Sequence, residues 1–374
     1  MAKHKKKGFS VIKAIISILV LAIVVCFAYI AVKCGGDLSW DNIERTVENI
    51  RAGVRSAETF EFGSSDGAVF ADAGGSLVKL TSGRVTEYSA AGSETYTEKM
   101  RAARPAVHSM AGRAVAYGAG DNDVRVFDNS GLMYSLVTEE EIVSATMSAD
   151  GKMALCARED GWNGAVTVYN TSGQAIYKWY CATGYPSVAA VSKDGKYMAV
   201  LTLGSAGCDI VYLRLDKETE QGRLNLGEEL ALDIRFLSNG SLTVITESEA
   251  ITTSNTGEMT SNYLFGGKSL IAYDLGSDEM TLLVLEDFPG GQCEVLTLSS
   301  SCQVLGSVTA ENPVVSVSAC GSKCAVLYKT EAVIYKRDMT PEVSLLRSGA
   351  EKIIMRKDGT ALILDSYMAE KLEP

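Results

Sequence analysis

Histidine is nearly absent from this chain, which has only His4 and His108 among 374 residues. Because His4 falls in a lysine-rich N-terminal tail, the body of the chain has a single imidazole. No Cys and His residues are grouped with zinc spacing, so we expect no metal. Residues 63–67, Gly-Ser-Ser-Asp-Gly, match a serine nucleophile motif. That motif needs a strand-to-helix turn and a nearby His, whereas we expect a turn between two strands here.

Other signatures of chemistry are also missing. No glycine-rich loop ends in Gly-Lys-Ser or Gly-Lys-Thr, so a nucleotide hydrolase is unsupported. Asp121 and Asp123 are close enough in sequence to contribute to a calcium site, but the further carboxylates of an EF-type loop are absent. A solvated turn is the better interpretation. The sequence therefore favours a protein that is not an enzyme and has no cofactor.

Acidic residues are absent only from the N-terminus. Residues 1–33 contain six lysines and no Asp or Glu, which leaves 29 basic and 46 acidic residues, a net charge of −17, for the rest. A body this acidic repels phosphate backbones, so we expect no nucleic-acid partner.

One apolar run is long enough to matter for the membrane. Residues 14–32 contain no charge and suffice to cross the ~30 Å hydrocarbon core as a helix. A cleaved signal peptide has a shorter apolar region and a small-x-small cleavage site, and neither is present. Lysines precede the run and acidic residues follow it, which predicts a cytoplasmic N-terminus. We expect a cytoplasmic basic tail at 1–10, a transmembrane signal anchor at 11–33 and an extracytoplasmic body.

The segment 34–57 reads as a helical linker. Its apolar residues recur three and four positions apart and form one stripe of a helix: Trp40, Ile43, Val47, Ile50 and Val54. A stalk helix packed on the body is the preferred interpretation, and a parallel dimer seam is the alternative, although two heptads are short for a coiled coil. The oligomeric state stays open.

Residues 58–374 show short β-rich runs separated by Gly, Asp, Asn and Ser turns, which is typical of an all-β domain. Two similar units begin at Val143 and Ser187, each with a Ser-x-Asp-Gly-Lys turn after its first strand. Further units begin near residues 58, 105, 232, 269, 314 and 352. Four strands per unit at a period of about 40 residues predict a β-propeller. We count eight blades; seven is the alternative if an N-terminal strand completes the last hairpin.

The repeated turns resemble those of a known group. Ser148-Ala-Asp-Gly-Lys-Met-Ala and Ser192-Lys-Asp-Gly-Lys-Tyr-Met-Ala are similar to the Ser-Pro-Asp-Gly-Lys turn of TolB-like and WD40-like bacterial propellers. The layout of a Lys-rich tail, one membrane span and an acidic propeller also resembles an uncharacterised bacterial family of membrane-anchored propellers. This resemblance implies a fold and no activity. The repeats of quinoprotein dehydrogenases and the Asp boxes of sialidases are absent.

Nine cysteines invite a disulfide interpretation. Cys156 and Cys324 lie in apolar strands, where a free Cys behaves as a small hydrophobe. Cys293 and Cys302 flank a hairpin but look out of register. Cys320 and Cys324 flank a tight turn and are the best candidates for a bridge, whose formation the sequence leaves open.

Strand order predicts one face for recognition. Loops from strand two to three, and from strand four to the next strand one, share a face of a propeller. Trp162 lies in the first kind of loop and Tyr185 in the following loop of the second kind, so we expect them close together. Asp121 and Asp123 should lie one blade away, and Phe288 is a weaker third aromatic member. Aromatic residues in Gly-bracketed loops suit partner binding; alternatively, Trp162 folds back over the blade edge.

We therefore expect a membrane-anchored, extracytoplasmic β-propeller that acts as a binding or scaffold module for a protein, peptide or envelope polymer. The alternative is an extracytoplasmic hydrolase or lyase that uses carboxylates at the propeller channel, which requires two Asp or Glu within about 5–10 Å. A sensor is disfavoured because the predicted cytoplasmic tail has no room for an output domain.

Overall fold

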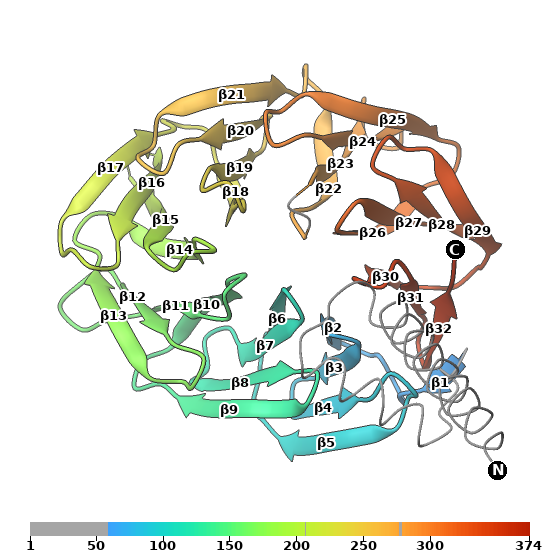
Figure 1. The fold of residues 1–374 in the computed structure, drawn as a ribbon, viewed down its shortest axis with the longest axis horizontal. Coiled ribbons are helices and arrows are strands. Elements are labelled where there is room, and N and C mark those ends of the chain that lie inside the picture. The colour runs from blue at the N-terminus through green and yellow to red at the C-terminus, as the bar shows by residue number, and fades with distance from the viewer. Residues whose placement is uncertain (1–58, 206, 277–278) are drawn as a thin grey trace, which may run out of the picture. The chain divides into compact units, whose positions relative to one another are not determined.

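The computed structural model describes residues 59–374 except 206, 277 and 278. Its regular elements are 32 strands, which form four-stranded antiparallel sheets arranged around an axis (Figure 1). The predicted tail, membrane anchor and helical linker lie outside the described residues. Within the described part of the chain, no helix is long and apolar enough to span a membrane.

Blades one to four each consist of four consecutive strands, ordered from the axis outwards (Figure 1). Blade one contains β2 (Val69–Ala73), β3 (Ser76–Leu80), β4 (Arg84–Tyr88) and β5 (Glu94–Lys99). Blade two contains β6 (Pro105–Met110), β7 (Arg113–Gly118), β8 (Asp123–Asp128) and β9 (Gly131–Val137). Blade three contains β10 (Ile142–Met147), β11 (Met153–Ala157), β12 (Ala165–Tyr169) and β13 (Ala175–Tyr180). Blade four contains β14 (Tyr185–Val191), β15 (Tyr197–Gly204), β16 (Gly207–Arg214) and β17 (Glu220–Asn225).

Blades five to seven repeat the same order. Blade five contains β18 (Ala231–Phe236), β19 (Leu242–Thr246), β20 (Glu249–Thr253) and β21 (Met259–Leu264). Blade six contains β22 (Ser269–Asp274), β23 (Thr281–Glu286), β24 (Cys293–Leu298) and β25 (Val304–Ala310). Blade seven contains β26 (Val314–Cys320), β27 (Lys323–Tyr328), β28 (Glu331–Lys336) and β29 (Pro341–Leu346).

Blade eight joins the two ends of the described chain. It contains β30 (Lys352–Met355), β31 (Ala361–Leu364) and β32 (Met368–Leu372), and its outer strand is β1 (Thr59–Glu61). Phe60 lies opposite Ala369 in this pairing. The eight-bladed prediction is therefore confirmed, and an N-terminal strand completes the last blade without lowering the count. The predicted first unit near residue 58 is wrong, because β1 pairs with the C-terminal strand and the first blade starts at Val69.

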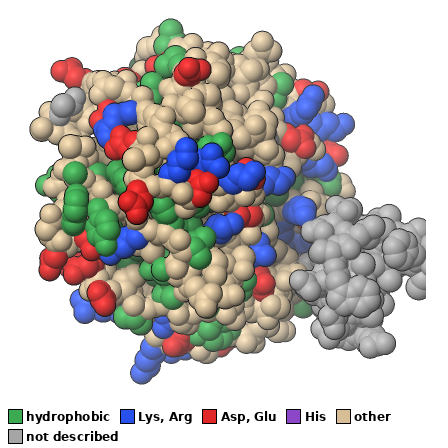
Figure 2. All heavy atoms as spheres, turned by 60° about the vertical axis from the view of Figure 1, so that its left-hand side comes forward, with side chains coloured by type: hydrophobic (Ala, Val, Ile, Leu, Met, Phe, Trp, Pro, Cys, Tyr) green, Lys and Arg blue, Asp and Glu red, His purple; other side chains and the backbone are tan. Residues whose placement is uncertain are grey.

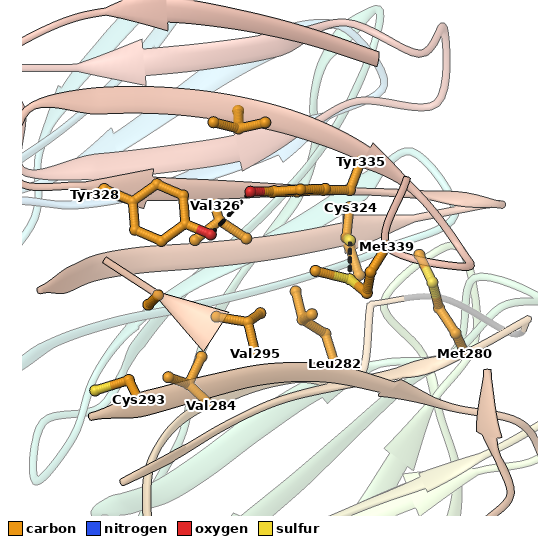
Figure 3. Close-up of a cluster of buried hydrophobic side chains, with 13 residues drawn as sticks. Met280, Leu282, Val284, Cys293, Val295, Cys324, Val326, Tyr328, Tyr335 and Met339 are labelled. Atoms are coloured by element: carbon orange, nitrogen blue, oxygen red, sulfur yellow. Dashed lines mark hydrogen bonds between the residues drawn. The ribbon is translucent and has the colours of Figure 1, made fainter. Parts of the chain in front are cut away.

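Apolar packing between blades holds the ring together. Eight buried clusters in the described residues correspond to the eight contacts between neighbouring blades. Figure 3 shows the cluster where Leu282 and Val295 of blade six meet Val326 of blade seven. The Tyr328 and Tyr335 hydroxyls lie 3.0 Å apart there and satisfy each other. Because the second and third strands are mostly buried on both faces, apolar residues dominate most of their sequences, and polar members such as Lys79 and Glu87 are buried with them.

The Ser-x-Asp-Gly-Lys turns form as predicted. The Ser192 hydroxyl donates to the Asp194 carboxylate at 2.7 Å, and the same carboxylate accepts the backbone N–H of Lys196. Gly195 has a φ of 65°, a left-handed conformation that glycine adopts without a steric cost. The Ser and Asp hydrogen bonds and the left-handed Gly therefore explain why this tight turn forms in blades three and four.

The seven cysteines of the described residues are free. Cys324 lies opposite Ala319 in the β26–β27 ladder, and Cys320 lies opposite Lys323. Since neighbouring residues of a strand point to opposite faces, Cys320 and Cys324 point to different sides of the sheet. Cys324 packs in the cluster between blades six and seven, and Cys320 packs against the cluster between blades seven and eight. The best candidate pair for a disulfide is thus not bridged.

Candidate functional site

The innermost strand of every blade begins on the same side of the ring, which we call the top face. This face consists of the loops between second and third strands and the loops that lead from an outer strand to the next inner strand (Figure 1). Trp162 lies in the loop between β11 and β12, and Tyr185 is the first residue of β14. Both residues therefore lie on the top face, on blades three and four.

The two loops that carry these aromatics are bonded to each other. The Asn163 N–H donates to the Cys181 carbonyl at 3.1 Å, and the Cys181 N–H donates to the Gly164 carbonyl at 2.9 Å. Gly164 packs closely against Pro186, since a Cβ at this position would lie 2.8 Å from the proline Cδ. These contacts hold the loop between β11 and β12 beside the start of β14, with the Pro186 ring against Gly164.

Trp162 packs on a residue that the sequence did not single out. Its ring centroid lies 5.4 Å from that of Tyr180, the last residue of β13, with 35° between the planes. The exposed fractions are 49% for Trp162, 42% for Tyr180 and 62% for Tyr185. Trp162 therefore leans on the blade edge and still presents half of its surface. We call Trp162, Tyr180 and Tyr185 the aromatic rim.

A charged pair orients Tyr180. The Lys178 ammonium lies 5.0 Å from the centre of the Tyr180 ring and 2.8 Å from a Glu159 carboxylate oxygen. The hydrogen bond to Glu159 raises the pKa of Lys178, and the ammonium attracts the face of the phenol ring. Tyr180 escaped the sequence analysis because it ends a regular outer strand. Only its contact with Trp162 marks Tyr180 as part of the site, and the two residues are 18 positions apart in sequence.

The two predicted aspartates are engaged within the protein. The buried Asp121 carboxylate accepts the Ala103 N–H at 2.7 Å and pairs with Arg101 at 3.0 Å. Asp123 lies 3.4 Å from Arg125, which also binds Glu98. Asp121 therefore ties the β5–β6 loop, which connects blades one and two, to the β7–β8 loop of blade two.

Phe288 is on the top face but apart from the aromatic rim. It lies in the loop between β23 and β24 of blade six, two blades from Tyr185, and is well exposed. Its carbonyl accepts the Gly291 N–H at 2.7 Å, which closes the tight Pro-Gly-Gly turn behind it. The structure thus places Trp162 and Tyr185 in adjoining, hydrogen-bonded segments of the top face and Phe288 elsewhere on the same face.

Exposed apolar side chains are distributed unequally between the two faces. Of 16 large hydrophobic residues exposed in the described part of the chain, 13 lie in top-face loops or at the top ends of strands. Those 13 are Val137, Val143, Trp162, Tyr180, Tyr185, Leu203, Leu230, Leu264, Ile271, Phe288, Val315, Leu346 and Tyr367. The other three, Ile176, Met259 and Val304, lie near the bottom ends of outer strands.

Two aspartates on inner strands are relevant to the hydrolase alternative. Asp233 lies on β18 and Asp274 on β22, in neighbouring blades. Burial raises the pKa of Asp233 to about 6 and also raises the pKa of Asp274. Asp233 accepts the Ile234 N–H at 2.8 Å and Asp274 accepts the Ala319 N–H at 3.0 Å. These bonds give both carboxylates structural roles, and carboxylate catalysis stays a prediction.

His108 has a structural role on the innermost strand of blade two. Its Nδ1 accepts the Met147 N–H of blade three at 3.0 Å. Burial lowers the pKa of His108 to about 4, so the ring is neutral and can accept this bond at physiological pH. His108 is therefore a partly buried residue of an inner strand whose Nδ1 is satisfied within the protein.

The described residues define an eight-bladed β-propeller whose exposed apolar side chains gather on one face. Residues 50–366 match the profile of the Family of unknown function (DUF5711), and the chain belongs to that family. No curated protein matches the sequence.

Solved propellers share the fold at low identity. The C-terminal WD40 domain of Sif2 is similar with a TM-score of 0.57 and 13% identity, over 84% of this chain and 95% of that one. BamB from Moraxella catarrhalis is similar with a TM-score of 0.52 and 11% identity, over 84% of this chain and 98% of that chain. Apo AztD from Citrobacter koseri is similar with a TM-score of 0.53 and 9% identity, over 82% of this chain and 90% of that chain. The resemblance to WD40-like propellers is therefore confirmed for the fold. Sequence identities this low support no inference about function.

Proposed function

We propose that this protein is a binding or scaffold module that holds a protein, peptide or envelope polymer on its top face. The observation that supports this most strongly is the gathering of 13 of the 16 exposed large hydrophobic residues on that face. Single exposed apolar residues are ordinary on any protein, but their concentration on one side of a molecule is characteristic of an interaction surface.

The aromatic rim is the proposed centre of recognition. Complete burial of a Trp or Tyr removes about 150–250 Å² from water. Because Trp162, Tyr180 and Tyr185 are about half exposed, a partner covers about half of that area on each, which is still a substantial part of the ~800 Å² that one partner buries in a standard interface. Trp and Tyr are also the residue types enriched where binding energy concentrates. Because the loops around them are bonded to each other, little conformational freedom is lost when a partner binds.

The flank of the propeller suits solvent better than a partner. In an oblique side view, Figure 2 shows acidic and basic side chains interspersed with scattered apolar groups. Mixed charges of this kind keep a surface hydrated and soluble. This supports the top face, rather than the side of the propeller drawn in Figure 2, as the place of binding.

We place the propeller outside the cytoplasm, held by the predicted anchor at residues 11–33. The lysines before the anchor and the acidic residues after it support this orientation. Val304→Cys, on the bottom face, tests the orientation with a membrane-impermeant maleimide on intact cells. We expect labelling without lysis; labelling only after lysis contradicts the proposed location.

Co-purification from native membranes tests the binding role. The full chain is compared with a Trp162→Ala/Tyr185→Ala variant and with a matched Ile176→Ala/Met259→Ala variant of the bottom face. We expect quantitative mass spectrometry to show partners lost from the first variant and retained by the second. Unchanged partner recovery with the first variant contradicts binding at the aromatic rim.

A further inference from the structure

Five consecutive innermost strands contain an extra residue close to the top face. The pairing of inner and second strands shifts register between Ile142 and Ser144, and equivalent shifts occur in blades four to seven. The inserted residues are Val143, Ser187, Leu232, Ile271 and Val315. Blades one, two and eight pair their first two strands without such a shift.

Each insertion is a β-bulge, which leaves one residue outside the ladder and re-aims its side chain. Four of the five inserted residues are apolar, and Val143, Ile271 and Val315 are 41%, 44% and 46% exposed. Because the innermost strands surround the axis (Figure 1), the inserted residues follow one another around it at the top of blades three to seven. We call these five residues the inner arc.

Acidic loops accompany the inner arc. The loops of the top face contain 14 Asp and Glu against six Lys and Arg, whereas the described loops of the bottom face contain eight against seven. Several acidic residues lie a few positions before arc residues in sequence. Glu139 and Glu141 precede Val143, Glu228 precedes Leu232, and Glu311 precedes Val315; these four glutamates are exposed. The top face thus combines apolar side chains with a surplus of negative charge.

We propose that the top face holds a basic polypeptide segment, with apolar side chains of the segment on the inner arc and its Lys and Arg side chains against the acidic loops. This inference rests on the proposed function and selects one of its three partner classes. An anionic polymer or lipid surface is disfavoured because the surplus of acidic over basic side chains in the top-face loops, 14 against six, repels it. A neutral glycan is disfavoured because it leaves the acidic loops without counter-charges and stacks on aromatic rings rather than on Val, Ile or Leu.

Charge complementarity adds specificity and speed to such a complex. Opposite charges at the rim of an interface steer the encounter and raise the association rate, and salt screens them. Apolar contacts at the centre depend little on salt. Binding by this face is therefore expected to weaken, without disappearing, as ionic strength rises.

The test uses the full chain in phosphatidylcholine nanodiscs, with empty discs as the reference. Three synthetic peptides serve as probes: an amphipathic Leu–Lys peptide, the same peptide with Glu for Lys, and the same peptide with Ser for Leu. We expect the Leu–Lys peptide to bind at least about tenfold more tightly than either of the others. Failure of the Leu–Lys peptide to bind beyond empty discs, or equal binding of the Leu–Glu peptide, overturns the inference.

Matched variants locate the binding. Glu139→Gln/Glu228→Gln is expected to weaken Leu–Lys binding about tenfold at low salt, and Glu218→Gln/Glu258→Gln on the bottom face is expected to leave it unchanged. Ile271→Ser tests the inner arc, with an unchanged thermal midpoint as the check of folding. Equal effects of the two glutamine pairs overturn the inference. If Trp162→Ala/Tyr185→Ala still abolishes partner capture in that case, the proposed binding role survives and only the basic partner is excluded.

Discussion

The indole of Trp162 and the phenol of Tyr180 lie 5.4 Å apart, one in a loop and the other at the end of an outer strand. Each ring covers part of the other, and both keep more than two fifths of their surface exposed. The Lys178 ammonium packs on the Tyr180 ring and is itself paired with Glu159. The pair is therefore a partly ordered surface, which is what a binding site needs before its partner arrives.

Tyr180→Ala should weaken partner capture because Trp162 loses the ring that orients it. The cost in stability should stay near the 0.5–1.5 kcal/mol typical of an aromatic pair. Ile176→Ala is the matched control, since Ile176 lies on the same strand with a similar exposed fraction at the bottom face. Thermal unfolding and partner recovery should be measured together. A large loss of stability with Tyr180→Ala would show that the pair is core rather than surface.

Much of the fold was predictable from local patterns, and the aromatic rim was only partly so. The Ser148 and Ser192 turns repeat with the blade, and predicted blade starts such as Pro105 and Val314 coincide with the observed ones. The first start failed because β1 pairs with a strand about 300 positions away, and no local pattern reports a pairing that distant.

The surroundings of the candidate site residues are set by residues that are near in space but distant in sequence, and the repeat pattern of the sequence does not reveal them. The environment of Asp121 is decided by Ala103 and Arg101 in another loop, so its burial was not visible from Asp-Asn-Asp alone. Tyr180 and the inner arc were missed for the same reason. Whether a strand end is exposed, or an extra residue bulges, is set by the partner strand and the adjoining blade.

Asp233→Asn should stabilise the protein at pH 7.5 and have little effect at pH 4. The folded-state pKa of Asp233 is raised to about 6, so its stabilising contribution is present at low pH and lost as pH rises through that value. Asn keeps an oxygen for the Ile234 N–H. Urea unfolding should show a gain of about 1–3 kcal/mol at pH 7.5. An equal effect at both pH values would argue against burial as the cause.

Phe62→Ala should open the closure between blades eight and one. Phe62 is buried against Phe70, with ring centroids 5.0 Å apart, and its carbonyl accepts hydrogen bonds from Lys79 and Tyr88. Loss of the ring should cost about 3–5 kcal/mol in urea unfolding. Phe60→Ala, at a half-buried ring, should cost less. Faster amide exchange in β32 than in β27 would locate the damage at the closure, and uniform exchange would contradict it.

Cys320 and Cys324 should behave as slow, unbridged thiols. Burial raises the pKa of Cys320 to about 11 and that of Cys324 to about 12, so almost no thiolate is present at pH 8. Iodoacetamide should therefore modify neither rapidly in the native protein and both after unfolding without reductant. A disulfide-linked peptide in the mass spectrum would contradict the free pair.

Site-specific photocrosslinking in native membranes tests the role of the top face most directly. A benzophenone amino acid is placed at Tyr185, Phe288 or Tyr367 on the top face, and at Ile176, Met259 or Val304 on the bottom face. We predict a discrete crosslinked partner from top-face positions only. A partner captured from the bottom face alone, or equally from both faces, would contradict the account.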